Sequence, residues 1–239
     1  VASGISSTSG NVSLTAIRNI VLSDGSSLTT VDGDMTLLAN AGGATVGEFI
    51  GIEADNATIL STGNGNISLT GHGGAGTGEQ KTGVYIDNGS ISSTGSGANA
   101  GTISLTGTGG NGSSFNRGVF IYQADVTSVD GDISFTGTGG GSYTSDEQQN
   151  HGVNLHESTV TSTGTGANAA RITVNGTGGA GLDSNVAAYL FFTDITSVDG
   201  AISLTGTGAG TVGSHNYGLI LQGGSVESTG TGTEAASIT

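Results

Sequence analysis

One short pattern, an apolar residue followed by Ser or Thr and a second apolar residue, recurs along the chain and constrains its fold more than any other feature. The eight copies begin at Val12, Met35, Ile67, Ile103, Ile133, Ile172, Ile202 and Ile238. The steps between them are 23, 32, 36, 30, 39, 30 and 36 residues, and their mean of about 32 residues falls in the range of solenoid repeats. Because successive side chains of a strand point to opposite faces, each copy predicts a strand with its apolar residues inward and its hydroxyl outward.

Two further apolar clusters precede each copy and predict two more strands in every repeat. The first strands begin at Val84, Val119, Val153, Ala188 and Leu219, and the second strands begin at Ile59, Ile91, Val126, Val160, Ile195 and Val226. The turns between them are rich in Gly, Asn and Asp, which suit corners that need a positive φ. No segment has helical periodicity. The sequence therefore predicts an all-β parallel β-helix, or β-solenoid, with three short strands in each triangular turn and about eight turns of roughly 32 residues.

The second half of the chain repeats in pairs of turns. Two types of corner alternate between the second and third strands, and the steps from Ile103 to Ile172 and from Ile133 to Ile202 are both 69 residues. The sequence begins and stops within a turn, with no polar cap at either place. We therefore expect residues 1–239 to be one continuous solenoid fragment of a longer array, which continues in the same polypeptide or across a subunit contact.

The charge of the chain narrows the list of partners. Nineteen acidic residues against four basic ones give a formal net charge of −15, which disfavours binding to a phosphate backbone or an anionic membrane surface. No apolar run approaches the roughly 18 residues of a membrane span. We therefore expect neither nucleic-acid binding nor membrane insertion, whereas divalent cations and basic partners remain open. The chain also has no Pro, which fits strands that donate their N–H groups to neighbouring turns.

Two Asp-Gly-Asp corners are candidate calcium ligands. Their carboxylates belong to Asp32, Asp34, Asp130 and Asp132. Calcium requires six to eight oxygen ligands, but Asp-Gly is also a common turn sequence. The third copy of this corner, Asp199-Gly200-Ala201, has lost the second carboxylate. Turn formation is therefore the favoured interpretation, and calcium is the alternative.

Rows of hydroxyl groups on the outer face of the third strands are the second candidate site. They include Thr106, Thr108, Thr136, Thr138, Thr205 and Thr207. Regular hydroxyl rows are suited to binding glycans, ordering water as ice-binding solenoids do, or packing against a neighbouring rod. The alternative, which we favour, is that they keep a β surface soluble and form hydrogen bonds between turns.

No arrangement of residues predicts catalysis, and we expect the chain not to be an enzyme. Polysaccharide-degrading β-helices place two or three carboxylates on one sheet face. Here Asp125 and Asp194 occupy equivalent positions two turns apart, or roughly 10 Å, which is long for a general acid and base. If the chain did degrade a polysaccharide, its activity would depend on these two residues.

Three repeated blocks carry a resemblance to a known class of protein. They are Thr-Gly-Thr-Gly-Gly from Thr106, Ser-Val-Asp-Gly-Asp-Ile-Ser from Ser128, and Ser-Thr-Gly-Thr-Gly-Ala-Asn-Ala from Ser162. These blocks resemble the repeats of large bacterial surface proteins of the filamentous-haemagglutinin and autotransporter type. The resemblance covers nearly the whole chain and implies secretion to the cell surface, a right-handed parallel β-helix and a role in adhesion or surface assembly. It carries over no functional residue. The expected function is an extracellular structural stalk or filament module that self-associates end to end or side to side.

Overall fold

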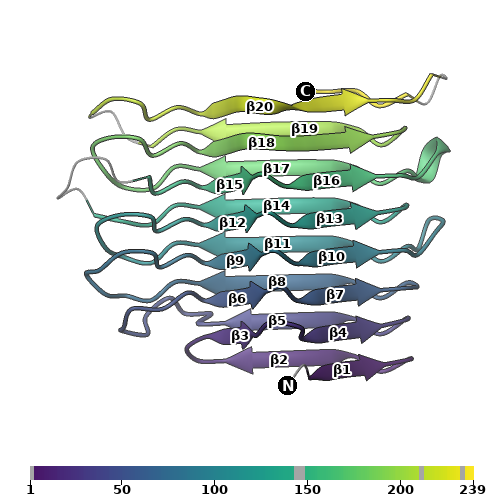
Figure 1. Ribbon diagram of the computed structural model, residues 1–239, viewed down its shortest axis with the longest axis horizontal. Helices are drawn as coiled ribbons and strands as arrows, with labels where there is room; N and C mark the ends of the chain where they lie inside the picture. The colour runs from purple at the N-terminus through teal and green to yellow at the C-terminus, as the bar shows by residue number, and fades with distance from the viewer. Residues whose placement is uncertain (1–2, 143–148, 210–212, 232–234) are drawn as a thin grey trace.

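The computed structural model describes residues 3–142, 149–209, 213–231 and 235–239, and these form a parallel β-solenoid. Its turns stack in one direction, so that strands far apart in the sequence lie side by side (Figure 1). The third strands of the repeat form a seven-stranded parallel sheet, called sheet B. Its strands are β2 (Val12–Ala16), β5 (Met35–Ala39), β8 (Ile67–His72), β11 (Ile103–Thr108), β14 (Ile133–Thr138), β17 (Ile172–Thr177) and β19 (Ile202–Thr207).

All seven strands of sheet B begin at the residues that the repeat predicted, which confirms both the fold class and the register. Six complete turns separate Val12 from Ile202, and a single parallel bridge joins Ile202 to Ile238 in the turn that follows. The expected number of about eight counted every copy of the pattern. The described strands therefore contain fewer complete turns than expected, although the mean length of about 32 residues holds.

The first and second strands of the repeat lie in one sheet, called sheet A, which has 13 strands. The first strands are β3 (Ile20–Leu22), β6 (Ile52–Asp55), β9 (Val84–Asp87), β12 (Val119–Tyr122) and β15 (Val153–His156). The second strands are β1 (Gly4–Ser7), β4 (Ser27–Thr30), β7 (Thr58–Ser61), β10 (Ser90–Ser93), β13 (Asp125–Ser128) and β16 (Thr159–Ser162). In the last two turns β18 (Ala188–Ser197) and β20 (Leu219–Ser228) run through both positions without a break. The turn is therefore built from two sheets, and not from the three separate faces of the predicted triangle.

A single residue in the left-handed conformation bends the chain between the first and second strands. In four successive turns this residue is Asn56, Asn88, Gln123 or Glu157, with φ between 45° and 50°. Gly, Asn and Asp were expected at corners with a positive φ, and two of these four residues are asparagine, which tolerates the conformation better than most other residues. One bent residue takes little length, so the two strands still pack against the same opposing sheet.

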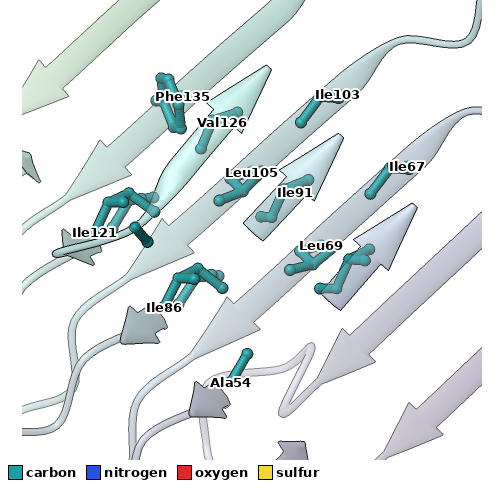
Figure 2. Packing of buried hydrophobic residues seen from close by; sticks show 14 of the residues in the cluster. Ala54, Ile67, Leu69, Ile86, Ile91, Ile103, Leu105, Ile121, Val126 and Phe135 are labelled. Carbon is teal, nitrogen blue, oxygen red and sulfur yellow. The ribbon is translucent and has the colours of Figure 1, made fainter. Parts of the chain in front are cut away.

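The core lies between the two sheets and continues from turn to turn. In β8 and β11 buried and half-buried residues alternate. Figure 2 shows how Ile67 and Leu69 are repeated by Ile103 and Leu105 one turn later, with Ile91 from sheet A close by. Each of these five side chains is completely buried. A turn therefore buries its apolar side chains against its neighbours as well as within itself.

Glycine brings the two sheets into close approach at the end of sheet B. Gly107 in β11 points inward, and a Cβ placed on it would lie 2.0 Å from the carbonyl oxygen of Gly118, just before β12. Gly137 in β14 faces the carbonyl of Gly152 in the same way, at 2.1 Å. No side chain fits in this space, which explains why the Thr-Gly-Thr block recurs.

Among the described residues the one helical segment is a short 3-10 turn, Gly166–Asn168, and no helix is long and apolar enough to cross a membrane. Loops of varying length return from sheet B to the first strands along one side of the solenoid (Figure 1). These loops build the candidate functional site.

Candidate binding groove beside the first strands

Three cavities lie where the returning loops meet the outer face of the first strands. The first cavity, of about 370 Å³, is lined by Arg18, Asn19, Glu48, Phe49, Ile50, Glu53, Glu79 and Gln80. The second, of about 290 Å³, is lined by Ile50, Gln80, Thr82, Tyr85, Phe115, Arg117 and Phe120. The third, of about 280 Å³, is lined by Gln149, His151, Ser184, Val186, Tyr189, His215, Tyr217 and Ile220. Because the first two cavities share Ile50 and Gln80, they form one groove, called here the aromatic groove.

Arg117 is the most unusual residue of the aromatic groove. Its guanidinium carbon lies 4.3 Å from the ring centre of Phe120 and 5.1 Å from that of Phe115. Burial lowers the pKa of Arg117 to about 10, so the side chain is still charged at neutral pH. Its Nε atom is buried without a hydrogen-bond partner, and the guanidinium forms no ion pair with a carboxylate of the described chain. Arg117 as a whole is half-buried, and a guanidinium stacked on aromatic rings retains hydrogen-bond donors for an anion.

The floor of the second cavity is an aromatic stack that follows the register of sheet A. Tyr85 and Phe120 are direct neighbours in β9 and β12, and their rings are parallel, 4.9 Å apart. The Tyr85 hydroxyl donates a hydrogen bond of 3.0 Å to Asp87. Burial, and next the hydrogen bond to the Asp87 carboxylate, raise the pKa of Tyr85, so this phenol is neutral throughout the physiological range.

The first cavity combines a second stacked arginine with carboxylates. Arg18 lies over the ring of Phe49 at 4.9 Å. Glu48 accepts a hydrogen bond of 2.9 Å from the buried ammonium group of Lys81, and this bond is the main reason why the pKa of Glu48 is lowered. Burial, and then repulsion from Asp55 and Asp87, raise the pKa of Glu53. Three of the four basic residues of the chain therefore line or adjoin the aromatic groove.

The third cavity contains a buried histidine. His151 accepts a hydrogen bond of 3.1 Å from the backbone N–H of Val186 through Nδ1, and its ring contacts Tyr189 edge to face at 5.4 Å. Burial, and then the charge of Arg117, lower the pKa of His151 to about 3. His151 is therefore neutral at physiological pH and supports the loop.

A row of buried asparagines fixes the loops that form the groove. In four successive turns one backbone N–H group of the loop donates a hydrogen bond to the Oδ1 atom of the equivalent asparagine in the next turn. The donors are Lys81, Asn116, Asn150 and Asn185, and the last acceptor is Asn216. The distances lie between 2.8 and 3.2 Å. This asparagine row satisfies loop amides that no strand pairs, which a buried backbone requires. It holds the ends of the returning loops, which differ in length, in register just before the first strands.

Sequence reasoning missed the asparagine row and the aromatic groove, although a signal for the row is present. Each asparagine stands two residues before the small residue that enters a first strand, as in Asn116-Arg117-Gly118 and Asn150-His151-Gly152. In the earlier turn Lys81 takes the place of asparagine, in Lys81-Thr82-Gly83. The stacking of Arg117 has no comparable signal, because it depends on how a single loop folds back.

The candidate calcium ligands lie in two separate corners. Asp32 and Asp34 accept hydrogen bonds from the backbone N–H groups of Asn64 and Asn66 at 3.2 and 3.0 Å. Asp130 accepts from the N–H of Gly97 at 2.6 Å, and Asp132 accepts from the N–H of Arg171 at 2.9 Å. Each carboxylate thus caps the corner of a neighbouring turn. In the described part of the chain no three acidic or histidine side chains form a group suited to a metal ion.

The candidate hydroxyl rows lie where the repeat predicted. Thr106 pairs with Thr136 and Thr108 with Thr138 in the register of β11 and β14. Thr205 and Thr207 occupy the same two columns in β19, where Asn175 and Thr177 of β17 precede them. All six threonines point outward and are half-buried or exposed. Sheet B therefore presents parallel hydroxyl columns with the spacing of neighbouring strands, about 4.8 Å.

Asp125 and Asp194 are not adjacent. Thr159 lies between them in the register of β13, β16 and β18, and its hydroxyl donates a hydrogen bond of 2.5 Å to Asp125. Asp194 accepts a hydrogen bond of 2.8 Å from Ser225 in the following turn. The two exposed carboxylates are thus engaged with the hydroxyls of neighbouring turns.

Comparison with known proteins finds no match for this chain. No protein-family model matches it, and neither the curated proteins nor the solved structures include a significant match.

Proposed function

We propose that the chain is a structural module of an extracellular bacterial surface protein, in which stacked turns provide length and rigidity for adhesion or surface assembly. The observation that carries this proposal is the continuous registry of sheet B over six complete turns, with the asparagine row maintaining it in the loops. A fold in which each turn binds the next is suited to elongation. The resemblance of the Thr-Gly-Thr-Gly-Gly and Ser-Val-Asp-Gly-Asp blocks to those of filamentous-haemagglutinin and autotransporter-type adhesins supports secretion and the cell-surface location.

Self-association is part of the proposal. Leu219 and Leu221 of β20 occupy the inward columns of Ala188 and Leu190, but they are 44% and 49% exposed. Another solenoid turn on β20, from the same polypeptide or from a second copy of the chain, would bury both side chains. Sedimentation velocity tests this contact, because Leu221→Lys is expected to reduce concentration-dependent association, whereas Val46→Lys, at an exposed apolar residue in a loop, should have no effect.

Surface display tests the structural function itself. The chain is placed between an outer-membrane anchor and an epitope tag, in versions with none, one or two additional copies of residues 103–171. We expect antibody access to the tag on cells with surface polysaccharide to increase with each copy, because each copy adds two turns, or about 10 Å. Equal access in all versions, at equal expression, would contradict a role as a stalk.

Glycan binding is a second candidate function. The aromatic groove is a better candidate for the glycan-binding surface than the hydroxyl rows are. The groove combines aromatic rings, stacked arginines and carboxylates in two joined cavities. A few oriented polar groups among apolar walls are typical of small-molecule sites. A glycan array separates the two surfaces, since Phe120→Ala removes a ring from the groove and Thr136→Tyr covers a hydroxyl column.

A further inference from the structure

We propose that the second cavity binds the carboxylate of an acidic sugar at Arg117, and that the neighbouring neutral sugar of the same glycan lies in the first cavity. This inference rests on the glycan-binding function proposed above and adds the ligand class, the residue that selects it and the direction of the glycan. It follows from the contacts of Arg117, the composition of the two linings and the net charge of the protein.

The second cavity provides a cation without a counterion. Arg117 is stacked on Phe120 and Phe115, and none of the described residues lining this cavity carries a carboxylate. The remaining polar groups are the amide of Gln80 and the hydroxyls of Thr82 and Tyr85. A guanidinium binds a carboxylate through two parallel hydrogen bonds. The ring walls supply the apolar contact that a sugar ring needs.

The first cavity has the opposite character and suits a neutral sugar. Its lining includes Glu48, Glu53 and Glu79 as well as Arg18. Carboxylates accept hydrogen bonds from sugar hydroxyls but repel a second acidic sugar. The change from a carboxylate-rich lining to a carboxylate-free one occurs across Ile50 and Gln80, which both cavities share. The groove therefore discriminates between the two ends of a disaccharide.

The net charge of −15 decides between one acidic sugar and a polyanion. At physiological ionic strength electrostatic interactions extend about 8 Å. A single carboxylate at Arg117 is attracted by the nearest cation, whereas a long polyanion would extend over the acidic remainder of the surface. The expected ligand is therefore a glycan with one acidic sugar among neutral sugars. Heparin-like or pectin-like polymers are not expected to bind.

The first test uses the unaltered chain and three small probes. Glucuronic acid, its neutral amide glucuronamide, and glucose are titrated separately and followed by saturation-transfer NMR. We expect glucuronic acid to bind at least about tenfold more tightly than either neutral probe, which corresponds to about 1.4 kcal/mol. Equal affinity for glucuronic acid and glucuronamide would overturn the proposal, and so would the absence of binding to all three.

The second test identifies the residue. Arg117→Gln is expected to lose the preference for glucuronic acid, and Arg117→Lys to retain part of it, because lysine keeps the charge but not the paired donors. Arg171→Gln is the matched control, since Arg171 lines different cavities beside Asp132 and Asp199. Circular dichroism establishes that each variant is folded. A folded Arg117→Gln variant with unchanged preference would contradict the assignment.

The two proposals fail in different ways. If the glycan array detects neutral glycans that bind equally to the original chain and to Arg117→Gln, the acidic-sugar inference is wrong and glycan binding stands. If no glycan binds to either protein, both the inference and the glycan-binding function are wrong. The structural function is tested separately by surface display.

Discussion

Replacing Asn150 by alanine should destabilise the solenoid far more than its position in a loop suggests. The Oδ1 atom of Asn150 accepts from the backbone N–H of Asn116 at 2.8 Å and from its side-chain amide at 3.0 Å. The Nδ2 atom donates to the carbonyl of Ala180 at 3.0 Å. Alanine leaves these three groups without partners, and each buried orphan costs about 1–3 kcal/mol. Since water will satisfy part of the loss, we expect the free energy of unfolding to fall by about 3–5 kcal/mol.

Thermal unfolding measured by circular dichroism tests this value. For a chain of this length 1 kcal/mol shifts Tm by roughly 2–4 °C, so Asn150→Ala should lower Tm by about 6–20 °C. Asn175→Ala is the control, because Asn175 lies exposed on the outer face of β17 and should change the free energy of unfolding by at most about 0.5 kcal/mol. Equal, small losses in both variants would refute the structural role of the asparagine row.

Four further measurements test other parts of the structure. Gly107→Ala forces a Cβ against the Gly118 carbonyl and should cost about 3 kcal/mol or more in chemical denaturation, whereas Gly42→Ala, which has nothing within 4 Å, should be nearly neutral. Burial lowers the pKa of His151 to about 3, below the 6.5 of a free histidine. The contribution of His151 to stability is therefore complete above pH 6.5 and declines as the pH falls toward 3, by up to about 1.4 kcal/mol per pH unit. His151→Gln should reduce this slope in urea titrations, and an unchanged slope would contradict a neutral buried His151. Since Asp32, Asp34, Asp130 and Asp132 already accept backbone N–H groups, Tm should be the same in calcium chloride and in EDTA, and a shift of several degrees would support the calcium alternative. Replacing Thr106, Thr136 and Thr205 by tyrosine should leave the fold intact because the three side chains point outward; loss of glycan binding or of ice shaping in that variant would assign the activity to the hydroxyl columns instead of the groove.

The repeat alone was sufficient to predict sheet B because strand alternation leaves little freedom. Ile103 and Leu105 are apolar and Ser104 is polar, so a shift by one residue would expose the core and bury the hydroxyl. The same argument applies in every turn, and all seven strands of sheet B begin where it places them. The merging of the first and second strands into one sheet was not predicted, because it depends on the φ angle of single residues such as Gln123 and Glu157.

The aromatic groove could not be predicted from the sequence, for a physical reason. Arg117 and Phe120 are three residues apart, and nothing in that spacing indicates that the guanidinium folds over the ring. Its position depends on the long loop before β12, which has no period, and on the aromatic neighbour Tyr85 from the preceding turn. The candidate binding residues of this solenoid therefore lie where loops of unequal length meet a regular sheet.

The chain is a stack of turns that pair in register, and we expect that the stack can be extended by further turns. Double electron–electron resonance measures this directly, because the chain has no cysteine and accepts two labelled ones at Thr36 and Ser203. These positions lie in one outward column of sheet B, five strand spacings or about 24 Å apart. A second copy of residues 103–171, inserted after the first, should increase the distance by about 10 Å while the cooperative unfolding transition is retained. An unchanged distance, or loss of the folded state on insertion, would show that the turns are not equivalent units that can be added to the stack.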